Sequence, residues 1–225
     1  MTGALAVFDV DGTLIDSRAR IGRAMSFAYR KAGLPDPGFE RTRTVVGLAL
    51  REAFIALEPD ASPALISELE AGYVEAFLAL QDDASSAETP YDGAFECLEA
   101  LAGAGWRLAI ATGKTRRGLD RLFAAHDIRG LFDACVCADD GPGKPHPFMI
   151  EESLRAAGAR AARAVMIGDA VHDMRMAAAA GVRAMGVSWG FARPEEMLEA
   201  GAHEVHDGFD SLRASLARFA RESAR

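Results

Sequence analysis

The chain has little cysteine and no long apolar run, and each shortage excludes a class of protein. Its 225 residues include three cysteines, and this small, odd number argues against a disulfide framework. Cys97, Cys135 and Cys137 are therefore predicted to be reduced thiols of the core. No run of about 18 apolar residues occurs, so no membrane span is expected. The N-terminal residues carry no cationic region and their apolar stretch stops at Asp9, so no signal peptide is expected. These absences favour a cytoplasmic protein.

The charge balance is acidic, and positive charge is nowhere concentrated. The chain has 33 acidic and 25 basic residues, a net charge of −8, and no basic block. Nucleic-acid binding needs a cationic surface, so a nucleic-acid partner is not expected. An acidic enzyme can still bind an anionic substrate, because a few local lysines, arginines or metal ions decide that.

What the chain does have is a regular alternation of apolar runs and helical patterns. The apolar runs are nearly continuous, which is typical of strands buried on both faces of a parallel sheet. Strands are predicted at residues 5–10, 107–111, 134–137, 164–167 and 182–187, and helices at 94–102, 116–125, 147–157 and 171–180. The alternation predicts an α/β fold with a doubly wound, Rossmann-like parallel sheet. A last helix at 211–219 is expected to pack on this sheet through Leu212, Leu216 and Phe219.

One region interrupts the alternation and is predicted to be helical throughout. Between Ser17 and Leu80 there is no strand pattern, and helical periodicity covers residues 21–31, 50–57 and 63–80. The polar stretch 81–90 that follows suits a hinge. We therefore expect a core made of residues 1–16 and 88–225, with residues 17–87 inserted as a helical cap.

Two carboxylates, Asp9 and Asp11, stand directly after the first apolar strand. Ionised carboxylates at such a place are costly unless something compensates them. A hard cation with oxygen ligands would do so, and Mg²⁺ suits a small carboxylate site. Asp11 and Gly12 alone would also fit an ordinary turn, but a turn does not account for Asp9.

Three further sites follow later strands of the predicted sheet. Thr112 and Gly113 follow the second strand, where a hydroxyl and backbone amides could hold an anion, although Thr112 would serve equally well as a helix N-cap. Lys144 lies in a proline-rich loop and offers a point charge for phosphate. Asp169 and Asp173, four residues apart, would share one side of a helix. Because ligands bind at the carboxyl ends of such strands, all these residues are predicted to lie together.

The two histidines near these motifs are not predicted to be ligands. His146 is expected to face solvent, and His172, between two acidic positions, is expected to point away from the site.

The combination of motifs resembles the haloacid dehalogenase superfamily, over essentially the whole chain. The most specific motif is Asp9-Val10-Asp11-Gly12-Thr13-Leu14, and Thr112, Lys144 and the pair Asp169/Asp173 follow in the family's order. The helical insertion looks like the small cap of this family. The segments 186–191 and 200–202 resemble its phosphoglycolate phosphatase branch.

The resemblance implies a phosphatase that works through a covalent intermediate. Asp9 would be the nucleophile, and Asp11 would protonate the leaving oxygen and then activate water. Mg²⁺ would be held by Asp9, the backbone carbonyl of Asp11 and Asp169, with support from Asp173.

The remaining motif residues would bind the phosphoryl group. Thr112 and Gly113 would hold its oxygens, and Lys144 would offset its charge. The family's dehalogenases lack an acid at the position of Asp11, so its presence favours phosphoryl transfer. A sugar-phosphate mutase or a non-enzymatic regulatory protein on the same scaffold stays open.

The substrate is expected to be a small phosphorylated metabolite, with phosphoglycolate as the leading candidate. Arg41, Arg43 and Arg51 flank the cap segment around Gly47, and one of them, Arg43 above all, could bind a substrate carboxylate. Solvated surface charge explains each arginine as well. Phosphonate hydrolysis would need a cap lysine, and only Lys31 is present. The protein is expected to be a monomer or a homodimer.

Overall fold

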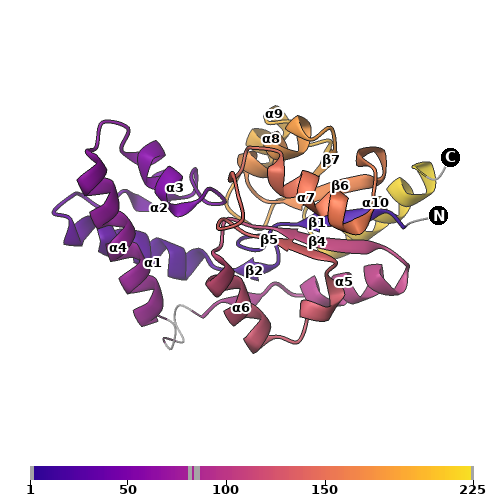
Figure 1. The fold of residues 1–225 in the computed structure, drawn as a ribbon, viewed down its shortest axis with the longest axis horizontal. Coiled ribbons are helices and arrows are strands. Elements are labelled where there is room, and N and C mark those ends of the chain that lie inside the picture. Colours follow the sequence, from indigo (N-terminus) through magenta and orange to yellow (C-terminus); the bar gives the residue numbers. More distant parts are fainter. Residues whose placement is uncertain (1–2, 81–82, 84–86, 224–225) are drawn as a thin grey trace.

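The computed structural model describes residues 3–80, 83 and 87–223, and its centre is a parallel sheet (Figure 1). The six strands lie in the order β5-β4-β1-β6-β7-β8, and every neighbouring pair is parallel. They are β1 (Leu5–Phe8), β4 (Arg107–Ala111), β5 (Ala134–Val136), β6 (Ala164–Gly168), β7 (Arg183–Val187) and β8 (Glu204–His206). The predicted α/β class and parallel sheet are confirmed.

Helices cover both faces of the sheet, as a doubly wound fold requires. On β1, Ala6 and Phe8 pack into one buried cluster, and Leu5 and Val7 into the other. The first cluster includes residues of α5 (Ala94–Gly103), α6 (Arg116–Ala125) and α10 (Phe209–Glu222), and the second includes residues of α7 (Phe148–Ala157), α8 (Val171–Ala179) and α9 (Pro194–Glu199). Alternate residues of one strand thus hold the two layers of helices, and the last helix packs on the sheet as predicted.

A separate group of helices lies to one side of the sheet (left in Figure 1). This helical insertion contains α1 (Arg18–Lys31), α2 (Gly38–Thr42), α3 (Leu50–Leu57) and α4 (Pro63–Ala79). It has its own buried cluster, in which Met25 and Tyr29 of α1 pack with Phe54 and Leu69. Among the described residues from 17 to 80 there is no strand, in agreement with the sequence.

The two connections between the insertion and the sheet pair with each other, which the sequence did not predict. Strand β2 (Ile15–Asp16) lies antiparallel to β3 (Thr89–Pro90). The polar stretch 81–90 was expected to suit a hinge. Its last two residues form β3, and residues 81–82 and 84–86 lie outside the described part of the chain. The insertion is therefore joined to the core by a short paired neck.

Some strand boundaries differ from prediction. β1 was expected to reach Val10 and ends at Phe8, because the chain turns at Asp9 and Val10 into the loop of the first motif. The short elements β8, α2 and α9 were not predicted.

The state of the cysteines and the character of the helices can be compared with the composition. The cysteines at 97, 135 and 137 are free. No helix among the described residues has the length and apolar character that crossing a membrane requires.

Candidate active site

The predicted site residues meet at the carboxyl ends of three adjacent strands. Asp9 follows β1, Thr112 follows β4 and Asp169 follows β6, and β1 lies between the other two strands in the sheet. Parallel strands end at the same edge of a sheet, so residues far apart in the sequence come together there.

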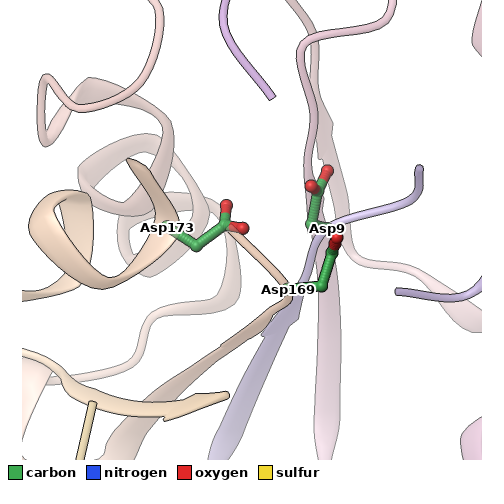
Figure 2. Close-up of side chains that lie close together, drawn as sticks. All are labelled: Asp9, Asp169 and Asp173. Carbon is green, nitrogen blue, oxygen red and sulfur yellow. The ribbon is translucent and has the colours of Figure 1, made fainter. Parts of the chain in front are cut away.

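Three carboxylates form the centre of this site. Asp9, Asp169 and Asp173 each offer an oxygen, and these atoms lie within 4.8 Å of one another. Figure 2 shows Asp9 and Asp169 beside each other at neighbouring strand ends, with Asp173 approaching them from α8. At most 1% of each residue is exposed. Such a concentration of buried acids is costly without compensating positive charge.

Lys144 supplies part of that charge. Its Nζ atom lies 2.8 Å from Asp9 Oδ1 and 2.7 Å from Asp173 Oδ1, and none of its side chain is exposed. Burial lowers the pKa of Lys144, but the carboxylates of Asp173 and Asp9 outweigh burial and raise it, so the ammonium group stays charged. Although Lys144 lies in a loop, its side chain is fully buried between these carboxylates.

The carboxylates remain under-compensated even with this lysine. Burial raises the pKa of Asp9 to about 6, and burial with the charges of Asp9 and Asp173 raises the pKa of Asp169 well above its usual value. Asp169 accepts hydrogen bonds from Thr13 Oγ1 at 2.7 Å and from Phe191 N at 2.8 Å. Asp9 Oδ2, by contrast, is buried and has no hydrogen-bond partner among the described residues.

This donor set fits a divalent cation that prefers oxygen. The three converging groups are carboxylates, and one of them, Asp9, has an oxygen without a hydrogen-bond partner among the described residues. Glycines keep the space around the acids free: a Cβ atom on Gly190 would come within 2.2 Å of Asp169 Oδ2, and one on Gly168 within 2.4 Å of Asp173. The arrangement thus leaves the carboxylates room to converge on an ion.

Asp11 lies outside this cluster and belongs to a second charged group. Lys114 Nζ lies 2.8 Å from Asp11 Oδ1 and 2.7 Å from Glu88 Oε1. Glu88 in turn pairs with Arg20 of the insertion. Burial is the largest influence on Asp11 and raises its pKa, against the lowering effect of Lys114. A raised pKa is what a carboxyl group needs if it is to donate a proton near neutral pH.

The predicted phosphate-binding residues are also at this edge. Thr112 is fully buried, and its Oγ1 accepts a hydrogen bond from Lys114 N at 3.2 Å. Gly113 faces the insertion so closely that a Cβ atom there would lie 2.7 Å from Gly47 O. Thr112 and Gly113 therefore lie at the same sheet edge as Asp9, and Gly113 lines the cavity that also contains Asp9 and Asp11.

The three arginines considered for a substrate carboxylate all have other partners. Arg43 makes a two-pronged ion pair with Glu196 of α9, at 2.7 and 2.8 Å, and binds Glu40 at 2.9 Å. Arg41 binds Glu58 at 2.9 Å and Arg51 binds Glu70 at 2.6 Å. None of the three lines the cavity at Asp9. The structure thus does not bring them to the carboxylate cluster, and Arg43 instead joins the insertion to the core.

The histidines lie as expected, away from the carboxylates. His146 is exposed. His172 Nε2 lies 2.9 Å from the carbonyl oxygen of Thr44, which is a further contact between core and insertion.

A cavity of about 410 Å³ opens above Asp9 and Asp11, between the core and the insertion. The loop that contains Val45, Val46 and Gly47 forms part of its wall. Phe39 of α2 stacks on Phe191 of the core, with ring centroids 6.4 Å apart. Together with the pair Arg43–Glu196, these contacts hold the insertion over the site.

Fold and site together define an α/β enzyme with an acidic, lysine-compensated centre under a helical cover. The chain belongs to the haloacid dehalogenase-like hydrolase family, whose sequence model matches residues 6–187. It is accordingly a hydrolase.

Relatives and solved structures agree with this assignment. The chain is 31% identical to a Dickeya dadantii protein named probable phosphatase IndB, over 92% of this chain and 91% of that protein. It is 32% identical to phosphoglycolate phosphatase of Caulobacter vibrioides, over 96% and 92%. A hydrolase from Pseudomonas syringae has the same fold, with a TM-score of 0.85 and 25% identity, over 96% of this chain and 99% of that structure. The chain stands among the phosphatases of its family.

Proposed function

We propose that this protein is a Mg²⁺-dependent phosphatase that hydrolyses a small phosphate monoester through an aspartyl-phosphate on Asp9. The observation that carries the proposal is the buried cluster of Asp9, Asp169 and Asp173, joined by Lys144. A structural role alone would not favour three buried carboxylates around one cation, because such clusters cost stability. Function is the better reason for them.

In the first step, Asp9 acts as the nucleophile and Asp11 as the general acid. An oxygen of Asp9 attacks phosphorus, the bond to the alcohol oxygen breaks, and Asp11 gives its proton to that oxygen. Thr112 and the amide of Gly113 hold phosphoryl oxygens, and Lys144 offsets their charge. Val10 N, at 2.6 Å, and Lys144 both contact Asp9 Oδ1, which orients the carboxylate and leaves its Oδ2 free of hydrogen bonds.

The second step returns the enzyme to its starting state. Asp11, now ionised, takes a proton from water, the water oxygen attacks phosphorus, and the Asp9 carboxylate leaves. Alcohol and inorganic phosphate are released, and Asp11 again holds its proton. When bound by Asp9, Asp169 and the Asp11 carbonyl, with Asp173 in support, Mg²⁺ supplies positive charge beside the anionic phosphoryl group.

The helical insertion is proposed to act as a cap, residues 17–87 on a core of 1–16 and 88–225. It covers the cavity, and cover of this kind excludes water from the leaving-group side. A closed cover suits small substrates rather than phosphoproteins. The cytoplasmic location and the monomeric or homodimeric state remain predictions from the sequence.

Phosphoglycolate is a candidate substrate, because the name of a relative points to it. Its carboxylate would need a cation. For Arg43 to provide it, the side chain would have to give up both oxygens of Glu196.

A sugar-phosphate mutase would use the same core residues, and a regulatory protein would use none of them. Product analysis separates these alternatives: a phosphatase releases inorganic phosphate, a mutase returns an isomeric sugar phosphate, and a regulatory protein does neither.

The decisive assay measures phosphate release from a panel of small phosphate esters, with Mg²⁺ and with chelator. We expect turnover only with Mg²⁺. Asp9→Asn, which keeps the shape but is a poor nucleophile, should abolish turnover and leave the circular dichroism spectrum unchanged. Normal turnover in that variant, or in chelator, would refute the mechanism.

A further inference from the structure

The insertion presents an apolar wall to the catalytic carboxylates. It contributes Ile21 and Met25 from α1, Val45 and Val46 from the loop between α2 and α3, and Tyr73 and Phe77 from α4. Among the described residues of the insertion, no charged side chain lines this cavity. Because the phosphoryl group must lie at Asp9 on the core side, the wall opposite it meets the alcohol part of the ester.

The aromatic part of this wall is held in a fixed orientation. The rings of Tyr73 and Phe77 stack, with centroids 5.6 Å and planes 22° apart. Two cations contact Phe77: Arg20 lies 5.0 Å and Lys114 lies 5.6 Å from the ring centroid. Both cations are paired with Glu88. Their charge is therefore compensated, and a carboxylate on the leaving group would have to displace Glu88 to reach them.

The cavity is also larger than a two-carbon acid needs. Its volume is about 410 Å³, and pockets that enclose drug-sized ligands hold roughly 300–1,000 Å³. A glycolate leaving group would leave most of the apolar wall in contact with water.

We propose that the substrate is a phosphate monoester whose alcohol part is uncharged and apolar, with a ring that packs on Phe77 and Tyr73, and not a carboxylate-bearing ester. This inference rests on the proposed phosphatase function and specifies the substrate class of that site. Apolar burial against the wall, rather than an ion pair, selects the leaving group.

Two arginines on the core side define the competing interpretation. Arg117 and Arg121 lie one turn apart on α6 and line the same cavity. Arg117 is exposed and Arg121 is partly buried. If these side chains read an anionic leaving group, phosphoglycolate would be preferred in spite of the apolar wall.

The first experiment compares kcat/KM, with Mg²⁺, for benzyl phosphate, ethyl phosphate and phosphoglycolate. All three are esters of primary alcohols, so differences between them report recognition of the leaving group more than bond reactivity. Burial of a phenyl ring should favour benzyl over ethyl phosphate by roughly ten- to a hundredfold. Phosphoglycolate should be no better than ethyl phosphate.

Variants of the wall test the cause of that preference. Phe77→Ala should lower the ratio of benzyl to ethyl turnover by at least about fivefold, because the ring loses its apolar partner. Phe27→Ala is the matched control: the residue lies in the same insertion but does not line the cavity, so the ratio should not change. Leu50→Arg, at a partly exposed position of the wall, should raise turnover of phosphoglycolate relative to ethyl phosphate.

The outcomes that overturn the inference are distinct from failure of the proposed function. Equal turnover of benzyl and ethyl phosphate would contradict it, and so would a preference for phosphoglycolate that Arg117→Ala or Arg121→Ala removes. If none of the three esters nor any other on the panel is hydrolysed with Mg²⁺, the phosphatase proposal itself fails and the inference fails with it.

Discussion

Replacing Lys144 with methionine should strongly destabilise the metal-free protein. The Lys144 ammonium group contacts both Asp9 and Asp173, at 2.8 and 2.7 Å, and its side chain is fully buried. Methionine preserves most of the apolar stem but removes the charge. Asp9 and Asp173, together with Asp169, would then face one another without that cation.

The expected loss is large for a single substitution. Removing one partner of a buried ion pair costs about 3–5 kcal/mol. In a chain of this size each kcal/mol shifts the thermal midpoint by about 2–4 °C, so a fall of roughly 6–20 °C is expected in chelator. Urea denaturation at neutral pH gives the free energy of unfolding, and Mg²⁺ should recover part of the loss, because it binds the same carboxylates.

The matched control is Lys31→Met. Lys31 pairs with Glu75, but the two side chains are 44% and 56% exposed, and such pairs contribute about 0–1 kcal/mol. If Lys144→Met costs no more than Lys31→Met, the cluster is not held together by this lysine and the electrostatic account of the site is wrong.

Three further predictions concern proton transfer and charge. Asp11→Asn should release a burst of nitrophenol from para-nitrophenyl phosphate and then turn over very slowly. The nitrophenolate leaving group needs no proton, but the water that attacks the aspartyl-phosphate still needs a base. Equal slowing of the burst and of the later steady turnover would contradict this role of Asp11. Burial raises the pKa of Asp9 from 3.8 to about 6. Between these two values the folded protein keeps the carboxyl proton that the unfolded chain has lost. The free energy of unfolding of the wild type therefore falls as the pH rises to about 6. In chelator, the free energy of unfolding of Asp9→Asn should therefore rise relative to that of the wild type over this pH range. If the difference between the two proteins does not change with pH, the pKa of Asp9 is not raised by folding. Arg43 lowers the pKa of Glu196 to about 2 from 4.5, so this pair stabilises the protein above pH 4.5 and the contribution is lost as pH falls towards 2. Glu196→Gln should cost about 0.2–1 kcal/mol at neutral pH, because the pair is partly exposed, and nothing near pH 2; a cost that persists in acid would show that the ion pair is not its source.

The strands that position the site were predictable because they are buried on both faces. The sequence of β1, Leu5–Phe8, is wholly apolar. A carboxylate directly after such a run is rarely needed for the fold itself, so it indicates a functional site. By contrast, β8 is three residues long, Glu204–His206, with an acid, a valine and a histidine, and no periodicity can be found in so short a segment. The pairing of β2 with β3 depends on residues more than 70 positions apart, so it follows from tertiary packing.

The same distinction holds within the site. Asp9, Thr112, Lys144 and Asp169 each follow or precede recognisable elements, so spacing was enough to propose them. Glu88, which binds Lys114 beside Asp11, lies within the polar stretch 81–90, which carries no periodic signal.

Long-range pairs and cavity walls were the least predictable features. The partner of Arg43, Glu196, is 153 residues away in the chain. From the sequence, a substrate or solvent could be suggested as the partner of this arginine, but Glu196 could not. The apolar periodicity of the insertion predicted its helices but not the cavity wall, because such periodicity does not distinguish a side chain in a core from one that lines a cavity.

The central claim is that Asp9 carries the phosphoryl group during turnover. Rapid acid quenching of the enzyme with Mg²⁺ and a hydrolysed ester, followed by mass spectrometry of the peptide that contains Asp9, tests it most directly. The account predicts a phosphoryl adduct on Asp9 that forms and decays at rates compatible with turnover, and that is absent from Asp9→Asn. Turnover with no adduct on Asp9, or with the adduct on another residue, would contradict it.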